Sequence, residues 1–104
     1  MKAYQYIFDP LAANEYEEAF KWYEQRSLVA ADNLIVAVQE AIIAICTDPY
    51  RYRNTYKKVR ELNLKKYPYA LIYFIDENKQ LITIISLFHH KRNPKRKYRK
   101  LKKK

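Results

Sequence analysis

The pattern of hydrophobic and polar residues predicts that the chain begins with a short strand followed by a helix. Aromatic side chains alternate with other residues from Tyr4 to Phe8, which indicates a strand over 4–8. Asp9 and Pro10 follow as an N-cap acceptor and a residue with a preset helical φ. The next apolar residues recur at steps of three and four: Ala12, Tyr16, Ala19, Phe20 and Tyr23. This spacing predicts a helix that fades near Ser27.

A second helix is predicted over residues 29–48, and Pro49 ends it. Its apolar residues form the strongest helical repeat in the chain: Ala31, Leu34, Ile35, Val38, Ala41, Ile42 and Ile45. Cys46 adjoins this stripe and is expected to be a buried small hydrophobic residue. Because the link between the two helices is short, we expect them to form a helical hairpin.

The second half of the chain changes to the two-residue period of strands after a tyrosine-rich loop. Strands are predicted over residues 59–64, 67–75 and 81–88. The middle strand is apolar on both faces and is therefore expected at the centre of the sheet. The turn over 76–79 contains no glycine, so Asn78 is expected to take the left-handed conformation there.

The predicted order β-α-α-β-β-β indicates an α+β fold with a mainly antiparallel sheet. Each layer has one apolar side, so the helical hairpin is expected to cover one face of the sheet. The other face is expected to stay open for function. A length of 104 residues suits one packed domain, which we place over residues 1–94. Residues 95–104 are expected to form a mobile basic tail.

The charge of the chain is separated along its length. Residues 1–48 hold three basic and eight acidic side chains, whereas residues 49–104 hold eighteen and three. The net charge of +10 is therefore −5 in the first half plus +15 in the second. Residues 88–104 alone carry ten Lys or Arg and no acid. Such a chain is expected to bind a polyanion or an acidic partner.

The composition excludes several classes of function. Without glycine, the chain cannot build the phosphate-binding loops of the Walker or dinucleotide type. One cysteine and two adjacent histidines cannot form an internal disulfide or a structural zinc site, so no metal or cofactor is expected. We find no apolar run that reaches the roughly 18 residues needed to span a bilayer, and no signal-peptide pattern. The sequence therefore predicts a cytoplasmic protein without a membrane partner.

Aromatic and basic residues alternate in the segment that follows the second helix. The segment contains Tyr50, Arg51, Tyr52, Arg53, Tyr56, Lys57 and Lys58. Such a mixture can stack on bases and bind the phosphates between them. The alternative is a loop whose tyrosines cover the edge of the core. Lys91, Arg96 and Tyr98 extend the candidate target-binding residues toward the C-terminus.

Two adjacent histidines supply the candidate acid–base groups. Cutting RNA without a metal needs a general base, a general acid and cations that stabilise the phosphate. His89 and His90 are the only histidines, and neighbouring residues of a strand point to opposite faces, so at most one serves the open face. An ordinary surface or packing role is the alternative for each. Tyr98 is a further candidate for proton transfer or base stacking.

The candidate cations for a phosphate are Arg60, Arg92 and either Lys57 or Lys58. Arg60 has the same strand parity as Leu62 and Leu64, which are expected to face the helices. A buried arginine without a partner would be costly, so Arg60 is expected at the rim, at a bulge or beside an acid. A structural ion pair is therefore the alternative to phosphate binding at Arg60.

Several short segments carry a resemblance to a known family. In chain order they are Trp22-Tyr23, Asp48-Pro49, Val59-Arg60-Glu61-Leu62, Tyr67-Pro68-Tyr69, Ile72-Tyr73 and Phe88-His89-His90-Lys91-Arg92-Asn93-Pro94. Together with the order of the elements, they make residues 4–94 resemble the RelE/ParE superfamily of bacterial toxins. The resemblance implies a toxin of a type II toxin–antitoxin module, held inactive by a cognate antitoxin in a hetero-oligomer.

The two branches of this superfamily imply different targets. The ParE-like branch poisons DNA gyrase and would not make this chain a nuclease. The RelE-like branch is a metal-independent endonuclease that cuts mRNA on the ribosome, and its matching positions here are Arg60 and residues 89–92. The pattern His89, Arg92 and Pro94 is more similar to the ParE-like branch. A nucleic-acid-binding protein without a toxin role, which acts through the tail and the Tyr/Arg segment, is the third hypothesis.

Overall fold

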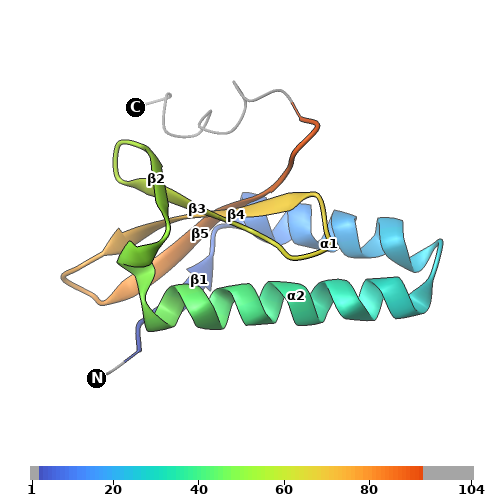
Figure 1. The fold of residues 1–104 in the computed structure, drawn as a ribbon, viewed down its shortest axis with the longest axis horizontal. Coiled ribbons are helices and arrows are strands. Elements are labelled where there is room, and N and C mark those ends of the chain that lie inside the picture. Colours follow the sequence, from blue (N-terminus) through green and yellow to red (C-terminus); the bar gives the residue numbers. More distant parts are fainter. Residues whose placement is uncertain (1–2, 93–104) are drawn as a thin grey trace.

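The structure of the chain is a computed structural model that describes residues 3–92 (Figure 1). Its elements are β1 (Gln5–Phe8), α1 (Pro10–Glu24), α2 (Leu28–Thr47), the 3-10 helix η1 (Pro49–Arg51), β2 (Arg53–Tyr56), β3 (Val59–Asn63), β4 (Tyr69–Asp76) and β5 (Leu81–His89). The α+β class with a helical hairpin and a mainly antiparallel sheet is confirmed. The predicted basic tail, with Arg96 and Tyr98, lies outside the described residues.

Both helices begin at side-chain caps that the sequence makes possible. The Asp9 carboxylate accepts a hydrogen bond from the Leu11 N–H at 3.2 Å, and Pro10 is the first residue of α1. The Ser27 hydroxyl accepts one from the Ala30 N–H at 3.1 Å at the start of α2. Helix α2 ends one residue before Asp48. The two helices lie side by side and are joined by a short turn (Figure 1).

The five strands form one sheet in the order β1-β5-β4-β3-β2. Strand β1 runs parallel to β5, and the other neighbouring pairs are antiparallel. Strand β4 occupies the centre, as its two-sided apolar sequence predicts. After both helices the chain enters the sheet at the opposite edge, β2, and returns strand by strand to β5, which lies beside β1.

Strand β2 and the turn η1 lie where the sequence predicts only a loop. Residues 53–56 read Arg-Asn-Thr-Tyr and show no apolar alternation. Pairing with β3 makes them a strand, with Arg53 opposite Glu61. The Asn54 side-chain amide donates to the carbonyls of Lys57 and Val59 at 2.9 and 3.1 Å and stabilises the turn between the strands. A partner distant in sequence therefore decides this element.

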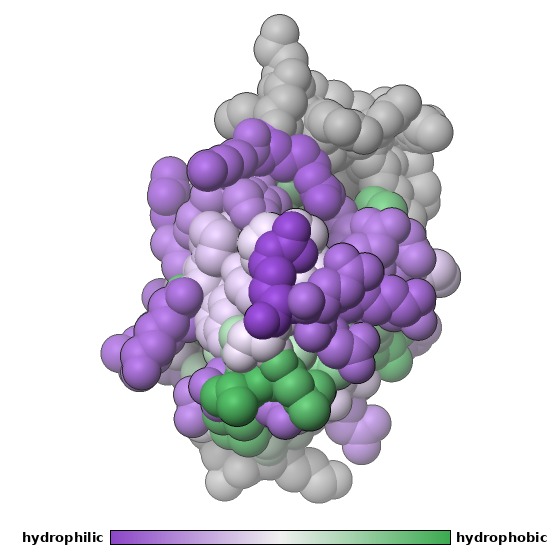
Figure 2. Space-filling model, turned by 90° about the vertical axis from the view of Figure 1, so that its right-hand side faces the viewer, coloured by the Kyte–Doolittle hydropathy of each residue, from purple (hydrophilic) through white to green (hydrophobic). Residues whose placement is uncertain are grey.

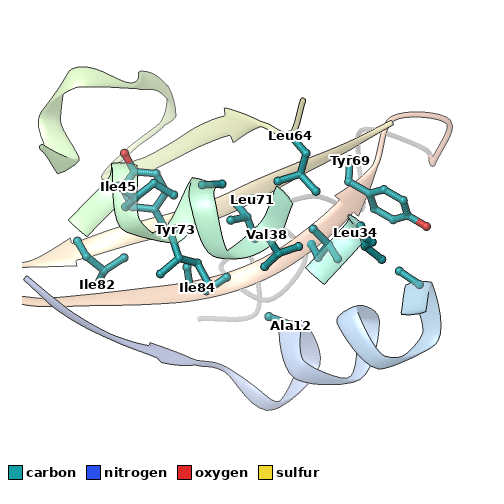
Figure 3. Packing of buried hydrophobic residues seen from close by; sticks show 14 of the residues in the cluster. Ala12, Leu34, Val38, Ile45, Leu64, Tyr69, Leu71, Tyr73, Ile82 and Ile84 are labelled. Atoms are coloured by element: carbon teal, nitrogen blue, oxygen red, sulfur yellow. The ribbon is translucent and has the colours of Figure 1, made fainter. Parts of the chain in front are cut away.

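The main core lies between α2 and the helix-facing side of the sheet (Figure 3). Leu34, Val38 and Ile45 of α2 are fully buried there. They pack in the same cluster as Leu71 and Tyr73 of β4. This part of the core follows the helical and strand periods of the sequence.

A bulge in β5 changes the face of every residue after it. Tyr73 pairs with Ile84 but the preceding residue Ile72 pairs with Ser86, so β5 holds one extra residue at this point. Ile84 and Leu87 therefore share the main core although three positions separate them. Strict alternation would have placed them on opposite faces.

The sheet face away from the helices is apolar rather than cationic. Val59, Ile72, Ile85 and Phe88 form a second buried cluster there, each at most 6% exposed. Neither α1 nor α2 belongs to this cluster. The prediction that cationic side chains converge over the middle of an open sheet face is therefore not supported.

The turn between β4 and β5 uses a different residue from the one predicted. Gln80 has a φ of 48°, whereas Asn78 is not among the residues with positive φ. Asp76 stabilises the turn by accepting a hydrogen bond from the Lys79 N–H at 3.2 Å. The prediction for Asn78 is wrong because the turn covers residues 77–80, and its left-handed residue is the last one, Gln80, directly before β5.

Helix α2 is long and apolar enough to cross a membrane by length and composition, with a mean hydropathy of 1.8. The helix is the one such segment in the described part of the chain. A core helix of a water-soluble domain passes the same test, and the inner face of α2 is packed in the main core. The expectation that no apolar segment reaches this length therefore needs correction for α2.

Candidate functional site

A buried carboxylate organises the end of the sheet where β1 stops and β5 continues alone. Glu15 of α1 is 8% exposed. Its Oε1 accepts hydrogen bonds from the Ser86 hydroxyl at 2.8 Å and the Leu87 N–H at 3.0 Å. These residues follow the bulge of β5, beyond the last β1 partner Ile84. Glu15 therefore takes the place of a neighbouring strand at this edge.

Arg92 completes this network from the end of β5. Its guanidinium donates to the Glu15 Oε2 in an ion pair. The guanidinium also lies 5.5 Å from the centre of the Phe88 ring. Arg92 is a predicted phosphate clamp, but the structure gives it a carboxylate and a ring as partners. Its charge is therefore already balanced in the folded chain.

His89 lies in a surface hollow of about 410 Å³ beside this ion pair. The hollow is lined by Glu15, Glu18, Ala19, Trp22, Tyr69, His89, Lys91 and Arg92. We call it the His89 pocket. The imidazole packs edge-on against the Tyr69 ring, with the ring centres 4.9 Å apart. The bulge in β5 brings His89 to this side of the sheet.

The ionisation of His89 follows from its surroundings. Partial burial lowers the pKa of the imidazole below its ordinary value, and the positive charges of Lys91, Arg92 and His90 lower it further. The Lys91 N–H donates to the His89 Nδ1 at 3.0 Å. In the neutral ring, Nδ1 is therefore the acceptor and the proton sits on Nε2. The free nitrogen of this imidazole is a donor, which is unfavourable for a general base.

His90 points away from the His89 pocket. Its ring Nε2 lies 3.1 Å from the Asn63 side-chain oxygen, and its backbone N–H donates to the Pro68 carbonyl at 2.9 Å. The residue is exposed. The two histidines thus face different surroundings, as strand alternation predicts.

Arg60 lies at the opposite end of the sheet, where its guanidinium hydrogen-bonds to backbone carbonyls. Its Nη1 donates to the carbonyls of Tyr50 and Tyr52 at 3.2 and 2.7 Å. The guanidinium also lies 5.3 Å from the centre of the Tyr50 ring. Arg60 is at the rim, as predicted, but carbonyls take the place of the acid that the ion-pair alternative requires. The two hydrogen bonds of Arg60 link η1 and the start of β2 to β3.

The alternating aromatic and basic residues gather beside Arg60. Arg51 lies 5.8 Å from the centre of the Tyr52 ring, and Lys57 lies 5.3 Å from that of Tyr56. A hollow of about 560 Å³ runs past this region. Lys57, Lys58 and Arg60 line it together with the acidic residues Asp76 and Glu77 of the neighbouring β4–β5 turn. Residues 50–60 hold five cations and no acid. We call these residues the hairpin cluster.

The predicted site residues therefore divide into two groups that do not meet. His89 pairs with Tyr69, and Arg60 pairs with Tyr73 on the other side of β4. The two positions are separated by about 13 Å along β4 and about 10 Å across it, from ordinary strand dimensions. His89 with Arg92 lies in one group, and Arg60 with Lys57 and Lys58 in the other. No general base, acid and phosphate clamp converge in the part of the chain that the structure describes.

Glu15 and Tyr69 are members of the site that the sequence patterns did not indicate. Glu15 falls on the apolar stripe of α1, three residues after Ala12 and four before Ala19. A carboxylate on the buried face of a helix requires a partner, and this is the signal that points to it. The partners themselves follow only from the fold. No three His, Cys, Asp or Glu side chains among residues 3–92 are grouped so that they could hold a metal ion.

Comparison with known proteins agrees with this architecture. Residues 6–94 match the model of the family described as the ParE toxin of the type II toxin–antitoxin system, parDE. No curated protein matches the chain significantly. The ParDE toxin–antitoxin system of P. aeruginosa includes a similar structure, with a TM-score of 0.64 and 16% identity, over 84% of this chain and 96% of that one.

The RelE toxin of E. coli has a similar fold. The isolated toxin matches with a TM-score of 0.60 and 16% identity over 97% of each chain. The match to the intact RelBE toxin–antitoxin complex of E. coli has the same score and identity, over 86% of this chain and all of that one. The fold and these matches define a RelE/ParE superfamily toxin. The chain belongs to the ParE toxin family of type II toxin–antitoxin systems.

Proposed function

We propose that this toxin inhibits DNA gyrase through protein contacts and does not cleave RNA. The observation that carries the proposal is the separation of the candidate catalytic residues into two groups. His89 presents a donor, and the charge of Arg92 is balanced by Glu15. Arg60 is bound to two backbone carbonyls. The family match to ParE supports the same target.

Paired assays of the two targets test this proposal. The purified chain is expected to inhibit DNA supercoiling by gyrase while translation and ribosome-bound mRNA stay intact. Ribosome-dependent mRNA cleavage with unaffected supercoiling would contradict it and favour the RelE-like alternative. Nucleic-acid binding without either effect would favour the non-toxin hypothesis. We propose a cytoplasmic location, because gyrase and the ribosome, the two candidate targets, both act in the cytoplasm.

Removing both histidines is expected to leave the toxic effect unchanged. A His89→Ala/His90→Ala variant keeps the fold and the Glu15–Arg92 network, so growth arrest on expression should match that of the wild type within about twofold. General acid–base groups contribute about 10²–10⁴-fold when they act in catalysis. A loss of that size, with an unchanged unfolding midpoint, would show that a histidine is catalytic.

The hairpin cluster is the surface that we propose contacts the target. Lys57→Glu/Lys58→Glu reverses two charges of a cluster without acids, and we expect target inhibition to weaken more than about tenfold, largely through slower association. Lys65→Glu/Lys66→Glu makes the same charge change outside the cluster. It is the matched control because each pair contains one lysine with a positive φ, Lys57 or Lys66. Equal losses from both variants would indicate a general effect of net charge.

A cognate antitoxin is the second proposed partner. The similar toxins of known structure include proteins solved in toxin–antitoxin complexes. The charge of +15 on residues 49–104 suits an acidic segment or an amphipathic helix with an acidic face. We propose that such a segment covers the hairpin cluster in a toxin–antitoxin hetero-oligomer and blocks target binding.

A further inference from the structure

The face of α2 opposite the core is apolar although it is exposed to solvent. Val29, Val36 and Ile43 are 69%, 53% and 63% exposed. They lie seven residues apart, so they form a line of about 21 Å along the helix at 1.5 Å per residue. Figure 2 faces the α1–α2 turn and shows apolar surface at its lower edge, where Figure 1 places α2. We call these three residues the α2 line.

The neighbouring helix α1 arranges its exposed residues differently. On α1, Leu11 and Trp22 are 48% and 49% exposed. The exposed residues between them include Asn14, Glu17 and Glu18, so no continuous apolar line forms there. The Lys21 Nζ lies 3.8 Å from a Glu17 carboxylate oxygen, as is usual on a solvated helix. Helix α2, by contrast, holds no Lys or Arg. Exposed apolar residues in one line mark a surface that a partner covers.

The spacing of the α2 line indicates what covers it. Residues seven apart return to nearly the same face of a helix, so the line suits contact with a second helix that lies beside α2. We propose that the α2 helix of a second copy of this chain packs antiparallel across the line, with a twofold axis at Val36. Val36 then faces its own copy, and Val29 faces Ile43 of the other chain.

The polar residues beside the line suit this arrangement. At 100° per residue, Asp32 and Gln39 lie on one side of the line, and Asn33 and Glu40 lie on the other. The twofold axis places each side of the line against the same side of the second copy. Glu40 therefore lies beside Asn33 of the second copy, and Asp32 lies beside its Gln39. Each carboxylate then lies beside an amide donor, and no two carboxylates meet. The surface is complementary to itself, as a twofold interface requires.

Charge at the ends of α2 selects the antiparallel direction. The C-terminal end of α2 leads within a few residues into the hairpin cluster, with its five cations. A parallel pair would bring two such clusters to the same end. An antiparallel pair separates them by about 30 Å, the length of a 20-residue helix. The helix dipoles are also opposed only in the antiparallel pair.

One helix pair makes a small interface, below the roughly 1,200 Å² of a stable complex, so we expect a dimer in the micromolar range. Sedimentation equilibrium of the full chain should show a monomer–dimer equilibrium. Val36→Lys places two charges at the twofold axis and should raise the dimer Kd about 100-fold or more. Asn14→Lys adds the same charge on the outer face of α1 and should leave the Kd unchanged. Circular dichroism checks the fold of both variants.

Cysteine cross-linking tests the direction independently. In a Cys46→Ala background, Val36→Cys should oxidise to a disulfide-linked dimer. Val29→Cys and Ile43→Cys should each stay monomeric alone and cross-link when mixed. Cross-linking of Val29→Cys with itself, or a monomer at all concentrations up to about 500 µM, overturns the proposal, which sets the dimer Kd in the micromolar range. These outcomes do not depend on the toxin target.

Discussion

Glu15→Ala is expected to lower the free energy of unfolding by about 3 kcal/mol, the lower end for breaking a buried ion pair. The substitution leaves the buried Ser86 hydroxyl and the Leu87 N–H without their acceptor and removes the carboxylate that balances Arg92. The lower end applies because the Arg92 side chain is 33% exposed and water partly replaces its partner. Urea denaturation measures the change, since a domain of this size is stable by about 5–15 kcal/mol.

A matched surface variant separates this effect from a general loss of charge. Glu17→Ala removes a carboxylate two residues further along α1, where the pair with Lys21 is exposed on both sides. A cost below about 0.5 kcal/mol is expected there. Glu15→Gln keeps an amide oxygen that can accept from Leu87 and should fall between the two. Similar midpoints for Glu15→Ala and Glu17→Ala would show that the network does not stabilise the fold.

Tyr73→Phe is expected to destabilise the fold at pH 9 but no longer at pH 12. At pH 9 it should cost about 1–2 kcal/mol, because the fully buried Tyr73 hydroxyl donates to the Pro49 carbonyl at 2.6 Å. Burial raises the pKa of this phenol strongly, against a smaller lowering by Arg60. The native chain therefore keeps the proton where the unfolded chain, with an ordinary pKa near 10, loses it.

The sign of the pH dependence follows from this difference. Below pH 10 both states are protonated, and the contribution of Tyr73 to stability is complete. Above pH 10 the unfolded state alone releases the proton, so the wild type loses about 1.4 kcal/mol per pH unit from this group. By pH 12 the Phe variant should be at least as stable as the wild type, as measured by urea denaturation at each pH.

A core variant without a titrating group provides the control. Ile45→Val removes one buried methylene and should cost about 0.5–1.5 kcal/mol at every pH. Its difference from the wild type should therefore stay constant from pH 9 to pH 12. A constant difference for Tyr73→Phe as well would show that the Tyr73 phenol ionises alike in the folded and unfolded chain.

The helices could be predicted from sequence because their signals are local. The N-cap Asp9 with Pro10, the apolar repeat of α2 and the stop at Pro49 each act within a few residues. The central position of β4 also followed from its two-sided apolar sequence. Strand β2 could not be predicted, because its side chains do not alternate and only β3 makes them a strand.

The site was harder to predict because it depends on contacts between distant residues. The sequence identified His89, Arg92 and Arg60 as candidates, but strand parity could not show that they lie at two ends of the sheet. The bulge at Ile85 shifts His89 by one position, and this irregularity arises where β1 has ended and Glu15 supplies the acceptor. A side chain 71 residues away thus satisfies the Ser86 hydroxyl.

The sequence by itself determined the element types, the separation of charge and the resemblance to the toxin superfamily, because periodicity, capping and composition are properties of neighbouring residues. Only the tertiary structure decided which charges are free to act. Arg92 and Arg60 are the same residue type and could not be distinguished from sequence. In the fold, Arg92 balances a buried carboxylate, whereas Arg60 binds two backbone carbonyls. The physical reason is that a charged side chain near a core must satisfy its hydrogen bonds, and the fold alone determines which partners lie within reach.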